Sequence, residues 1–180
     1  MIIRQETEQD FSAIYDFVKT AFLTAYVSDG PDGTEQDLVN KLRSSGNYIP
    51  ELALVMEDES ADNKLIGHIM LTKIAIQGVH HLPKNMFEIL ILAPVAIDAG
   101  YRNKGHGSGL VRESLKRAKA EGYAAVILLG DPKFYERFGF VSAEKFGIKN
   151  KQKYPDENVL VLELVPGILE GIEGTVDFDY

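Results

Sequence analysis

The chain has 180 residues, no cysteine and a formal net charge of −8, and its length suits a single domain, residues 1–180. Its 45% hydrophobic and 26% charged residues are the balance of a soluble globular protein. The negative charge argues against general nucleic-acid binding, and the missing cysteine excludes disulfides and a cysteine acyl-enzyme. Because no signal-peptide pattern or bilayer-length apolar run is present, we expect a cytoplasmic protein that does not bind membranes.

The first half of the chain predicts a strand, two helices and two further strands that form a hairpin. A capping-box pattern at residues 7–10 starts the first helix, whose apolar residues recur at helical spacing. A polar loop, Ala25–Gly33, separates the two helices, and Gly67 predicts a β-bulge in the hairpin. These elements cover residues 2–3, 11–22, 34–46, 51–57 and 65–76.

The second half alternates strands and helices. A nearly continuous apolar strand contains Pro94, which cannot donate to a sheet ladder and indicates a bulge or a parting of strands. Gly122 is expected to cap the long helix that follows, and Gly139 to end a short one. The element order predicts a mixed α/β sheet with helices on its faces. The predicted elements are residues 87–97, a helix to about 121, 124–129, a helix after 131–132, 140–141 and 159–165.

The most informative segment is the glycine-rich loop that joins the strand ending at Ile97 to the long helix. Gly105 and Gly107 allow positive φ angles and close backbone approach. Amides at a helix start point outward together and, with the helix dipole, favour an anion. Arg102 and Lys104 add positive charge. The loop therefore predicts a phosphate or pyrophosphate site, and the alternative is a strand-to-helix turn without a ligand.

Better-known phosphate and nucleophile motifs do not fit this loop. A Walker A sequence needs Lys-[Ser/Thr] after the second glycine, where this chain has His106-Gly107. A dinucleotide fingerprint needs a last glycine where Leu110 stands. A nucleophile elbow needs glycine on both sides of Ser108, where His106 and Leu110 stand instead. A nucleotide-dependent enzyme is therefore disfavoured.

Arg102-x-x-Gly105-x-Gly107 matches the [Arg/Gln]-x-x-Gly-x-[Gly/Ala] signature of the GNAT N-acetyltransferase superfamily. Residues 134–140 resemble that family's Phe-Tyr-x-[Arg/Lys]-x-Gly-Phe segment, and residues 128–132 are similar to the bacterial YhbS-type subfamily of predicted N-acetyltransferases. The resemblance implies an acyl-CoA N-acyltransferase fold, whose central, mostly antiparallel sheet has splayed strands and flanking helices. It also implies an N-acetyltransferase that moves an acetyl group from acetyl-CoA to an amine, without a metal.

The resemblance also implies which residues contact the cofactor. The strand before the loop would bind the pantetheine arm, and the loop would hold the pyrophosphate. The implied cofactor-binding residues are Val95, Ala96, Ile97, Arg102, Asn103, Lys104, Gly105, His106, Gly107, Ser108, Gly130 and Phe134.

Two residues are candidates for catalysis. The family's tyrosine often protonates the departing thiolate, which implies this role for Tyr135; the alternative is aromatic packing beside Phe134 and Phe138. The sequence does not determine the general base that deprotonates the amine, and Glu88, which begins the strand leading to the site, is the candidate for it. Its alternative is a solvated strand end, and Glu51 is a weaker candidate.

The acceptor is expected to be a small-molecule or peptide amine, bound by the loop at residues 25–33, the second helix and the tail after Pro166. A rival function is a non-enzymatic acyl-CoA sensor or interaction domain on the same fold. His68 is expected to be structural, and the four histidines have no carboxylate cluster with ligand spacing, so no metal is predicted. The sequence does not distinguish a monomer from a homodimer.

Overall fold

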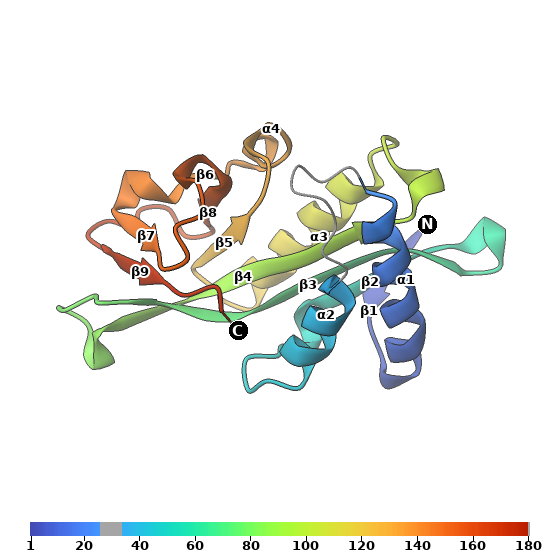
Figure 1. Cartoon of the computed structure of the whole chain (residues 1–180), viewed down its shortest axis with the longest axis horizontal. Helices are drawn as coiled ribbons and strands as arrows, with labels where there is room; N and C mark the ends of the chain where they lie inside the picture. The colour runs from blue at the N-terminus through green and yellow to red at the C-terminus, as the bar shows by residue number, and fades with distance from the viewer. Residues whose placement is uncertain (26–33, 180) are drawn as a thin grey trace. The chain divides into compact units, whose positions relative to one another are not determined.

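The computed structural model describes residues 1–25 and 34–179. They form two compact units, of which the first comprises residues 1–71 and 94–117 and the second residues 72–93 and 118–180. Strands β3 (Lys64–Gln77) and β4 (Met86–Ile97) each contribute residues to both units. Figure 1 shows both strands as long arrows.

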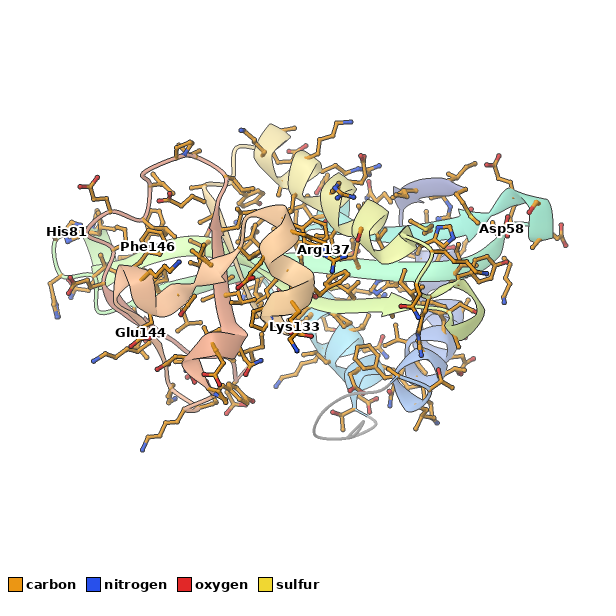
Figure 2. All side chains as sticks on the ribbon, turned by 90° about the horizontal axis from the view of Figure 1, so that it is seen from above. Asp58, His81, Lys133, Arg137, Glu144 and Phe146 are labelled. Atoms are coloured by element: carbon orange, nitrogen blue, oxygen red, sulfur yellow. The ribbon has the colours of Figure 1, made fainter. Side chains whose placement is uncertain are left out.

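The sheet of the first unit is antiparallel. Strand β1 (Ile2–Gln5) pairs with β2 (Ala53–Asp58), which pairs with the first part of β3. The register shifts after Met56, because Met56 pairs with Gly67 whereas Glu57 pairs with Leu65. This irregularity is the β-bulge that the glycine predicted. Asp58 lies at the end of this hairpin (Figure 2) and caps its turn by accepting a hydrogen bond from the Ser60 amide at 3.0 Å.

The described residues of this unit contain three α-helices that belong to it wholly or mainly. They are α1 (Phe11–Leu23), α2 (Glu35–Arg43) and α3 (His106–Ala120), and α1 and α2 pack beside each other (Figure 1). The predicted capping box is present, since the Thr7 amide donates to Asp10 Oδ2 at 2.7 Å. A 3-10 turn, Glu8–Asp10, separates the box from α1. Ile14 and Val18 are buried, as their helical spacing predicted.

The second unit combines parallel and antiparallel pairs. Strand β5 (Ala125–Leu129) runs parallel to β4 and antiparallel to β8 (Val159–Glu163), which also pairs antiparallel with β6 (Val141–Ser142). Strand β9 (Gly174–Val176) pairs with the end of β3 and with β7 (Ile148–Asn150). The short helix α4 (Pro132–Tyr135) follows β5.

Alternate residues of these strands build the core of the second unit. On one face of the sheet, β4, β5 and β8 each supply two buried apolar side chains, two positions apart on the strand. The tail adds further buried apolar residues that close the core. The strand pairs are residues 89 and 91, 125 and 127, and 159 and 161, and the tail residues are 169, 172, 176 and 178. Val126 and Leu128 on the opposite face of β5 are also fully buried, which explains its uninterrupted apolar sequence.

The predicted mixed α/β fold with a mostly antiparallel sheet is confirmed. The boundaries differ by a few residues, and the strands β7 and β9 were not predicted. Within the described residues, no helix is both long and apolar enough to cross a membrane. The remaining 3-10 helices are Pro50–Leu52, Glu59–Ala61, Pro83–Asn85, Ala99–Tyr101, Glu136–Phe138, Ala143–Phe146 and Asp156–Asn158.

Candidate active site

The loop between β4 and α3 turns the chain sharply into a helix start. Asp98 accepts a hydrogen bond from the Gly100 amide at 2.8 Å, and Asn103 and Gly105 have φ angles of 60° and 86°. Glycine adopts such angles freely and asparagine tolerates them, whereas most other residues are strained. The Gly109 amide donates to the Gly105 carbonyl at 3.0 Å and opens the helical hydrogen-bond pattern.

The first turn of α3 consists of residues predicted to contact the cofactor. His106, Gly107 and Ser108 are half-buried, and the His106 ring lies 5.8 Å from the Tyr101 ring, centroid to centroid. Gly107 lies within the helix, so Gly105 alone of these two glycines uses a positive φ. Amides in the first turn of a helix have no acceptor within it and, with the helix dipole, favour a phosphate.

The Arg102 side chain joins this loop to helix α1. Its Nε donates to the Ile97 carbonyl at 3.0 Å, and its Nη atoms donate to the Thr24 and Ala21 carbonyls at 2.7 and 2.5 Å. Carbonyls at the end of a helix lack intrahelical donors and carry partial negative charge, so the guanidinium caps α1. From the sequence, the Arg102 guanidinium was predicted to lie beside a phosphate. In the structure the side chain is held by α1, which leaves the Arg102 backbone for the predicted phosphate contact.

Two lysines lie beside the loop, with different partners. Lys64 Nζ is 2.9 Å from Asp98 Oδ2, and this hydrogen bond lowers the pKa of the Asp98 carboxyl, so the lysine's charge is balanced. Lys104 Nζ donates to the neutral Gly100 carbonyl at 2.7 Å and lies 5.5 Å from the centroid of the Tyr101 ring. Within the described part of the chain, Lys104 therefore leaves a net positive charge close to the helix start, where it would favour an anion.

The predicted pantetheine-binding residues end strand β4. Ala96 is buried, whereas Val95 and Ile97 are half-buried. The Ile97 side chain packs against β3, since its Cδ1 lies 3.0 Å from the position that a Cβ would take at Gly67. Its carbonyl already accepts from Arg102. Backbone contacts of Val95 and Ile97 with pantetheine stay a prediction.

Tyr135 ends helix α4 in the second unit. Asp131 caps this helix by accepting from the Lys133 amide at 2.9 Å. The Tyr135 ring meets Phe134 and Phe140 edge-on, with centroids 4.9 and 5.7 Å away. Burial raises the pKa of Tyr135 to about 12, so the phenol keeps its proton at neutral pH. No hydrogen-bond partner for its hydroxyl lies within residues 1–25 and 34–179.

Phe134 and Gly130 were predicted to contact the cofactor. In the structure, both residues contact other residues of the second unit. Arg137 Cζ lies 5.1 Å from the centroid of the Phe134 ring, and Arg137 Nη2 donates to the Lys133 carbonyl at 3.1 Å; Figure 2 labels both basic residues on this turn. Gly130 follows β5 and lies directly beneath the Tyr135 ring. Cofactor contacts of Phe134 and Gly130 remain predictions.

Glu88 lies on the surface of the second unit. Its side chain is 56% exposed, and Oε1 is 3.5 Å from Lys73 Nζ. The carboxylate is thus open to solvent and faces one cation. This placement is compatible with both interpretations of the sequence, a general base and a solvated strand end.

A buried polar network in the first unit was not predicted. Glu6 accepts hydrogen bonds from Arg43 Nε at 2.9 Å, Arg43 Nη2 at 3.0 Å and the Tyr48 hydroxyl at 2.9 Å. His68 Nε2 lies 2.9 Å from Glu6 Oε2, and the side chains of both residues are fully buried. The only signal in the sequence was His68, a polar residue in an apolar strand, for which a structural role was expected. That role agrees with its position in this network.

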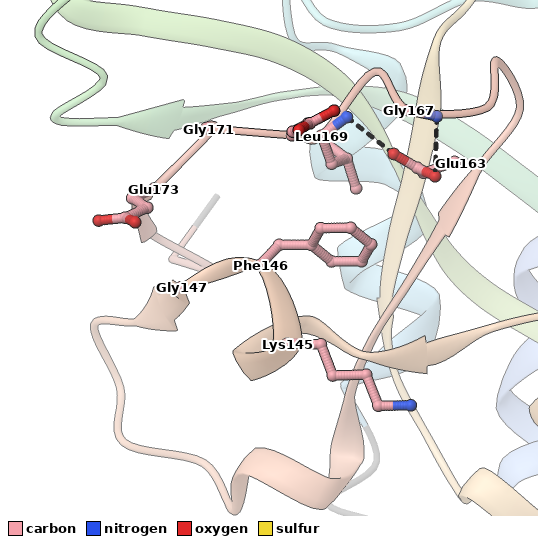
Figure 3. Close-up of a pocket in the computed structure, with 9 residues that line it drawn as sticks. Lys145, Phe146, Gly147, Glu163, Gly167, Leu169, Gly171 and Glu173 are labelled. Carbon is pink, nitrogen blue, oxygen red and sulfur yellow. Dashed lines mark hydrogen bonds between the residues drawn. The ribbon is translucent and has the colours of Figure 1, made fainter.

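A cavity of about 440 Å³ opens in the second unit, with walls formed by Lys145, Phe146, Gly147 and the tail (Figure 3). Glu163 holds the tail in place by accepting from the Gly167 and Leu169 amides at 3.1 and 2.8 Å. The tail after Pro166 lines this cavity, and its role in binding an acceptor stays a prediction. The loop expected to help, at residues 25–33, lies outside the described residues except for Ala25. Within the described residues, no group of three histidine or acidic side chains could hold a metal ion.

Comparison with known proteins identifies the family. Residues 2–143 match the model of the acetyltransferase (GNAT) domain. The chain is 30% identical over 178 residues to YhbS of Escherichia coli K12, which is described as an uncharacterised N-acetyltransferase. The aligned region covers 99% of this chain and 96% of that protein. The chain therefore belongs to the GNAT acetyltransferase family, and the predicted family, fold and N-acetyltransferase class are confirmed.

Two solved structures of the family resemble the chain over nearly its whole length. YhbS from Escherichia coli in complex with CoA matches with a TM-score of 0.82 and 29% identity, covering 98% of this chain and 88% of that one. A GNAT family acetyltransferase from Brucella melitensis in complex with acetyl-CoA matches with a TM-score of 0.73 and 26% identity, covering 97% and 93%.

Proposed function

We propose that this acetyltransferase uses acetyl-CoA as its donor and a primary amine, on a small molecule or a peptide, as its acceptor. The loop before α3 carries the proposal, because its positive-φ turn, its helix start and Lys104 provide what a pyrophosphate needs. The complexes of the two related structures with CoA and acetyl-CoA support this assignment. We further propose one catalytic domain over residues 1–180 and a cytoplasmic location.

The reaction needs no covalent enzyme intermediate. The amine nitrogen attacks the thioester carbonyl, and the tetrahedral intermediate collapses by breaking the C–S bond, with its electron pair leaving on sulfur. Holding both reactants in place is worth roughly 7–11 kcal/mol. A backbone amide of β4 would stabilise the negative charge that develops on the carbonyl oxygen.

Tyr135 would stabilise the leaving sulfur. The family resemblance implies that this tyrosine protonates the thiolate, but its pKa of about 12 exceeds the ~8.5 of a thiol by about 3.5 units. Complete proton transfer would therefore be uphill by roughly 5 kcal/mol. We assign Tyr135 as a hydrogen-bond donor to the sulfur, and the proton that neutralises the thiolate comes ultimately from the amine nitrogen. We expect Tyr135→Phe to lower turnover by ~10²-fold and to leave acetyl-CoA affinity nearly unchanged.

Glu88 is the proposed general base that takes the amine proton. Its carboxylate is reachable from solvent, and Lys73 Nζ lies 3.5 Å from Oε1. The proton would then leave to water from this exposed position.

The experiment is an acetyl-CoA turnover assay with a panel of amines. Because the chain contains no cysteine, a thiol reagent reports only the CoA that the reaction releases. We expect thiol release that depends on both an amine and the enzyme, with N-acetylated amine detected by mass spectrometry. Thiol release at the uncatalysed rate with every amine, by protein that binds acetyl-CoA, would contradict the proposed amine acceptor.

A further inference from the structure

The end of strand β5 is held by an unusual pair of hydrogen bonds. In the β5–β8 ladder, the last registered pair is Leu129 opposite Val159. Gly130, which follows Leu129, and Asn158, which precedes Val159, are also hydrogen-bonded to each other. The Gly130 amide donates to the Asn158 carbonyl at 2.9 Å, and Asn158 Nδ2 donates to the Gly130 carbonyl at 3.1 Å.

The side chain of Asn158 replaces a backbone donor in this pair. In an antiparallel ladder the second hydrogen bond would come from the backbone amide of the opposite residue. The Asn158 amide instead donates to the Pro155 carbonyl at 2.9 Å and closes a 3-10 turn. The asparagine side chain therefore allows β8 to begin directly after a turn while both polar groups of Gly130 stay bonded.

The Tyr135 ring rests on the backbone that this pair holds. A Cβ added at Gly130 would lie 2.8 Å from Tyr135 Cδ2 and closer still to Cε2, so any larger residue must displace the ring. Gly130 does not have a positive φ. Glycine is therefore required here by the tyrosine ring above it and not by the backbone conformation.

Among the described residues, packing alone determines where the Tyr135 hydroxyl lies. The ring is enclosed by Gly130 on one side and by Phe134, Phe138 and Phe140, with centroids 4.9 to 6.4 Å away. Its hydroxyl has no hydrogen-bond partner in the described part of the chain. A change in the backbone beneath the ring would therefore move the hydroxyl without opposition from a hydrogen bond to any described residue.

We propose that Gly130 and Asn158 are positioning residues for Tyr135, which deepens the proposed function and rests on the role given there to the tyrosine. Asn158 fixes the peptide groups of Gly130, Gly130 supports the ring, and the ring presents the hydroxyl to the leaving sulfur. This assignment replaces the expected cofactor contact of Gly130. The two roles differ in their consequences, because a cofactor contact governs affinity whereas a positioning residue governs turnover.

The test uses two variants that disturb the pair from opposite sides. Gly130→Ala pushes on the ring, and Asn158→Asp keeps the size of the side chain but replaces the amide donor with an oxygen that repels the Gly130 carbonyl. Matched controls are Gly46→Ala, where an added Cβ meets nothing within 4 Å, and Asn150→Asp, which removes a similar amide bond to the Tyr154 carbonyl. Each change is made in the wild type and in Tyr135→Phe.

Turnover is measured as thiol release from acetyl-CoA, with the best amine of the panel or with water as acceptor. Acetyl-CoA affinity is measured by calorimetry, and folding by thermal unfolding. Since a displacement of 1 Å can cost ~10²-fold in rate, we expect both variants to lower kcat by ~10-fold or more in the wild type. In Tyr135→Phe, which has no hydroxyl to position, they should change kcat by less than ~2-fold. The acetyl-CoA Kd should stay within ~2-fold throughout, and the controls should match the wild type.

Three results would overturn the inference while Tyr135→Phe still lowers turnover. They are wild-type kcat in both variants, an equal loss in the Tyr135→Phe background, and a weakened Kd with unchanged kcat. If Tyr135→Phe itself turns over at the wild-type rate, the proposed role of the tyrosine fails and the inference fails with it. Asn158→Asp adds no atom to the packed ring, so it decides the question if Gly130→Ala does not fold.

Discussion

Replacing Glu6 with glutamine should destabilise the first unit strongly and in a pH-dependent way. Burial raises the pKa of Glu6, but the hydrogen bonds from His68 and Arg43 outweigh it and hold the pKa at about 2. Against an ordinary value of 4.5, the depression of about 2.5 units corresponds to ~3 kcal/mol of stability. Removing one partner of a buried ion pair typically costs a similar ~3–5 kcal/mol, because the Arg43 charge is then buried without its carboxylate.

The sign of the pH dependence follows from the direction of the shift. A carboxyl with a depressed pKa contributes its full stability above its unfolded value of 4.5 and loses it as the pH falls towards about 2. Urea unfolding followed by circular dichroism should show Glu6→Gln about 3 kcal/mol less stable at pH 7. Its melting temperature should be lower by roughly 6–12 °C, and its stability should fall less than that of the wild type between pH 5 and pH 2.5.

Asp177→Asn is the control for this experiment. The pKa of Asp177 is also lowered to about 2, mainly by the Lys151 hydrogen bond, but this pair lies on the surface, with side chains 67% and 30% exposed. Water and salt screen such a pair, so the control should unfold like the wild type. If Glu6→Gln has wild-type stability at pH 7, or an unchanged loss of stability in acid, the calculation from the buried network is refuted.

Three further changes test the candidate active site. Gly105→Val should abolish acetyl-CoA binding in calorimetry, because a β-branched residue is strained at a φ of 86°, whereas Gly46→Val should bind normally. Arg102→Leu removes the donors that cap α1 and should lower the melting temperature and weaken acetyl-CoA binding together; a loss of affinity at wild-type stability would place the side chain on the cofactor instead. Glu88→Gln should lower kcat/KM, and an unchanged kcat/KM would make Glu88 a solvated strand end.

Local signals predicted much of the fold. The bulge beside Gly67, the capping box of Thr7 and Asp10 and the end of α3 depend on residues close in sequence. At that end Gly122 has a φ of 86°, and the Tyr123 amide reaches the Ala118 carbonyl at 3.0 Å. Turn and cap chemistry is specified by a few neighbouring residues, so the sequence reveals it.

Elements that depend on distant partners were not predicted. Strand β9 has three residues and begins at Gly174, where an added Cβ would collide with the Gln77 carbonyl. The glycine thus lets the tail approach β3, but its sequence resembles an ordinary loop. The Glu6 network joins residues 37 to 62 positions apart, and no spacing in the sequence reveals such contacts.

The candidate site was predicted unevenly for the same reason. The backbone of the loop, including the positive φ of Gly105, follows from its own residues. The direction of the Arg102 side chain does not, because its acceptors, Ala21 and Thr24, lie about 80 residues earlier. The support of Tyr135 by Asn158 also does not follow from neighbouring residues, because the β5–β8 ladder brings Asn158 beside Gly130.

The central claim, that the loop before α3 binds acetyl-CoA as the acetyl donor, is tested most directly by calorimetric titration of the purified protein. Acetyl-CoA is the ligand, and ATP and NADH, which also carry phosphates, are the controls. We predict saturable binding of acetyl-CoA in the micromolar range and much weaker binding of both controls. Equal binding of all three would make the loop a general anion site, and no binding of acetyl-CoA would contradict the proposed donor.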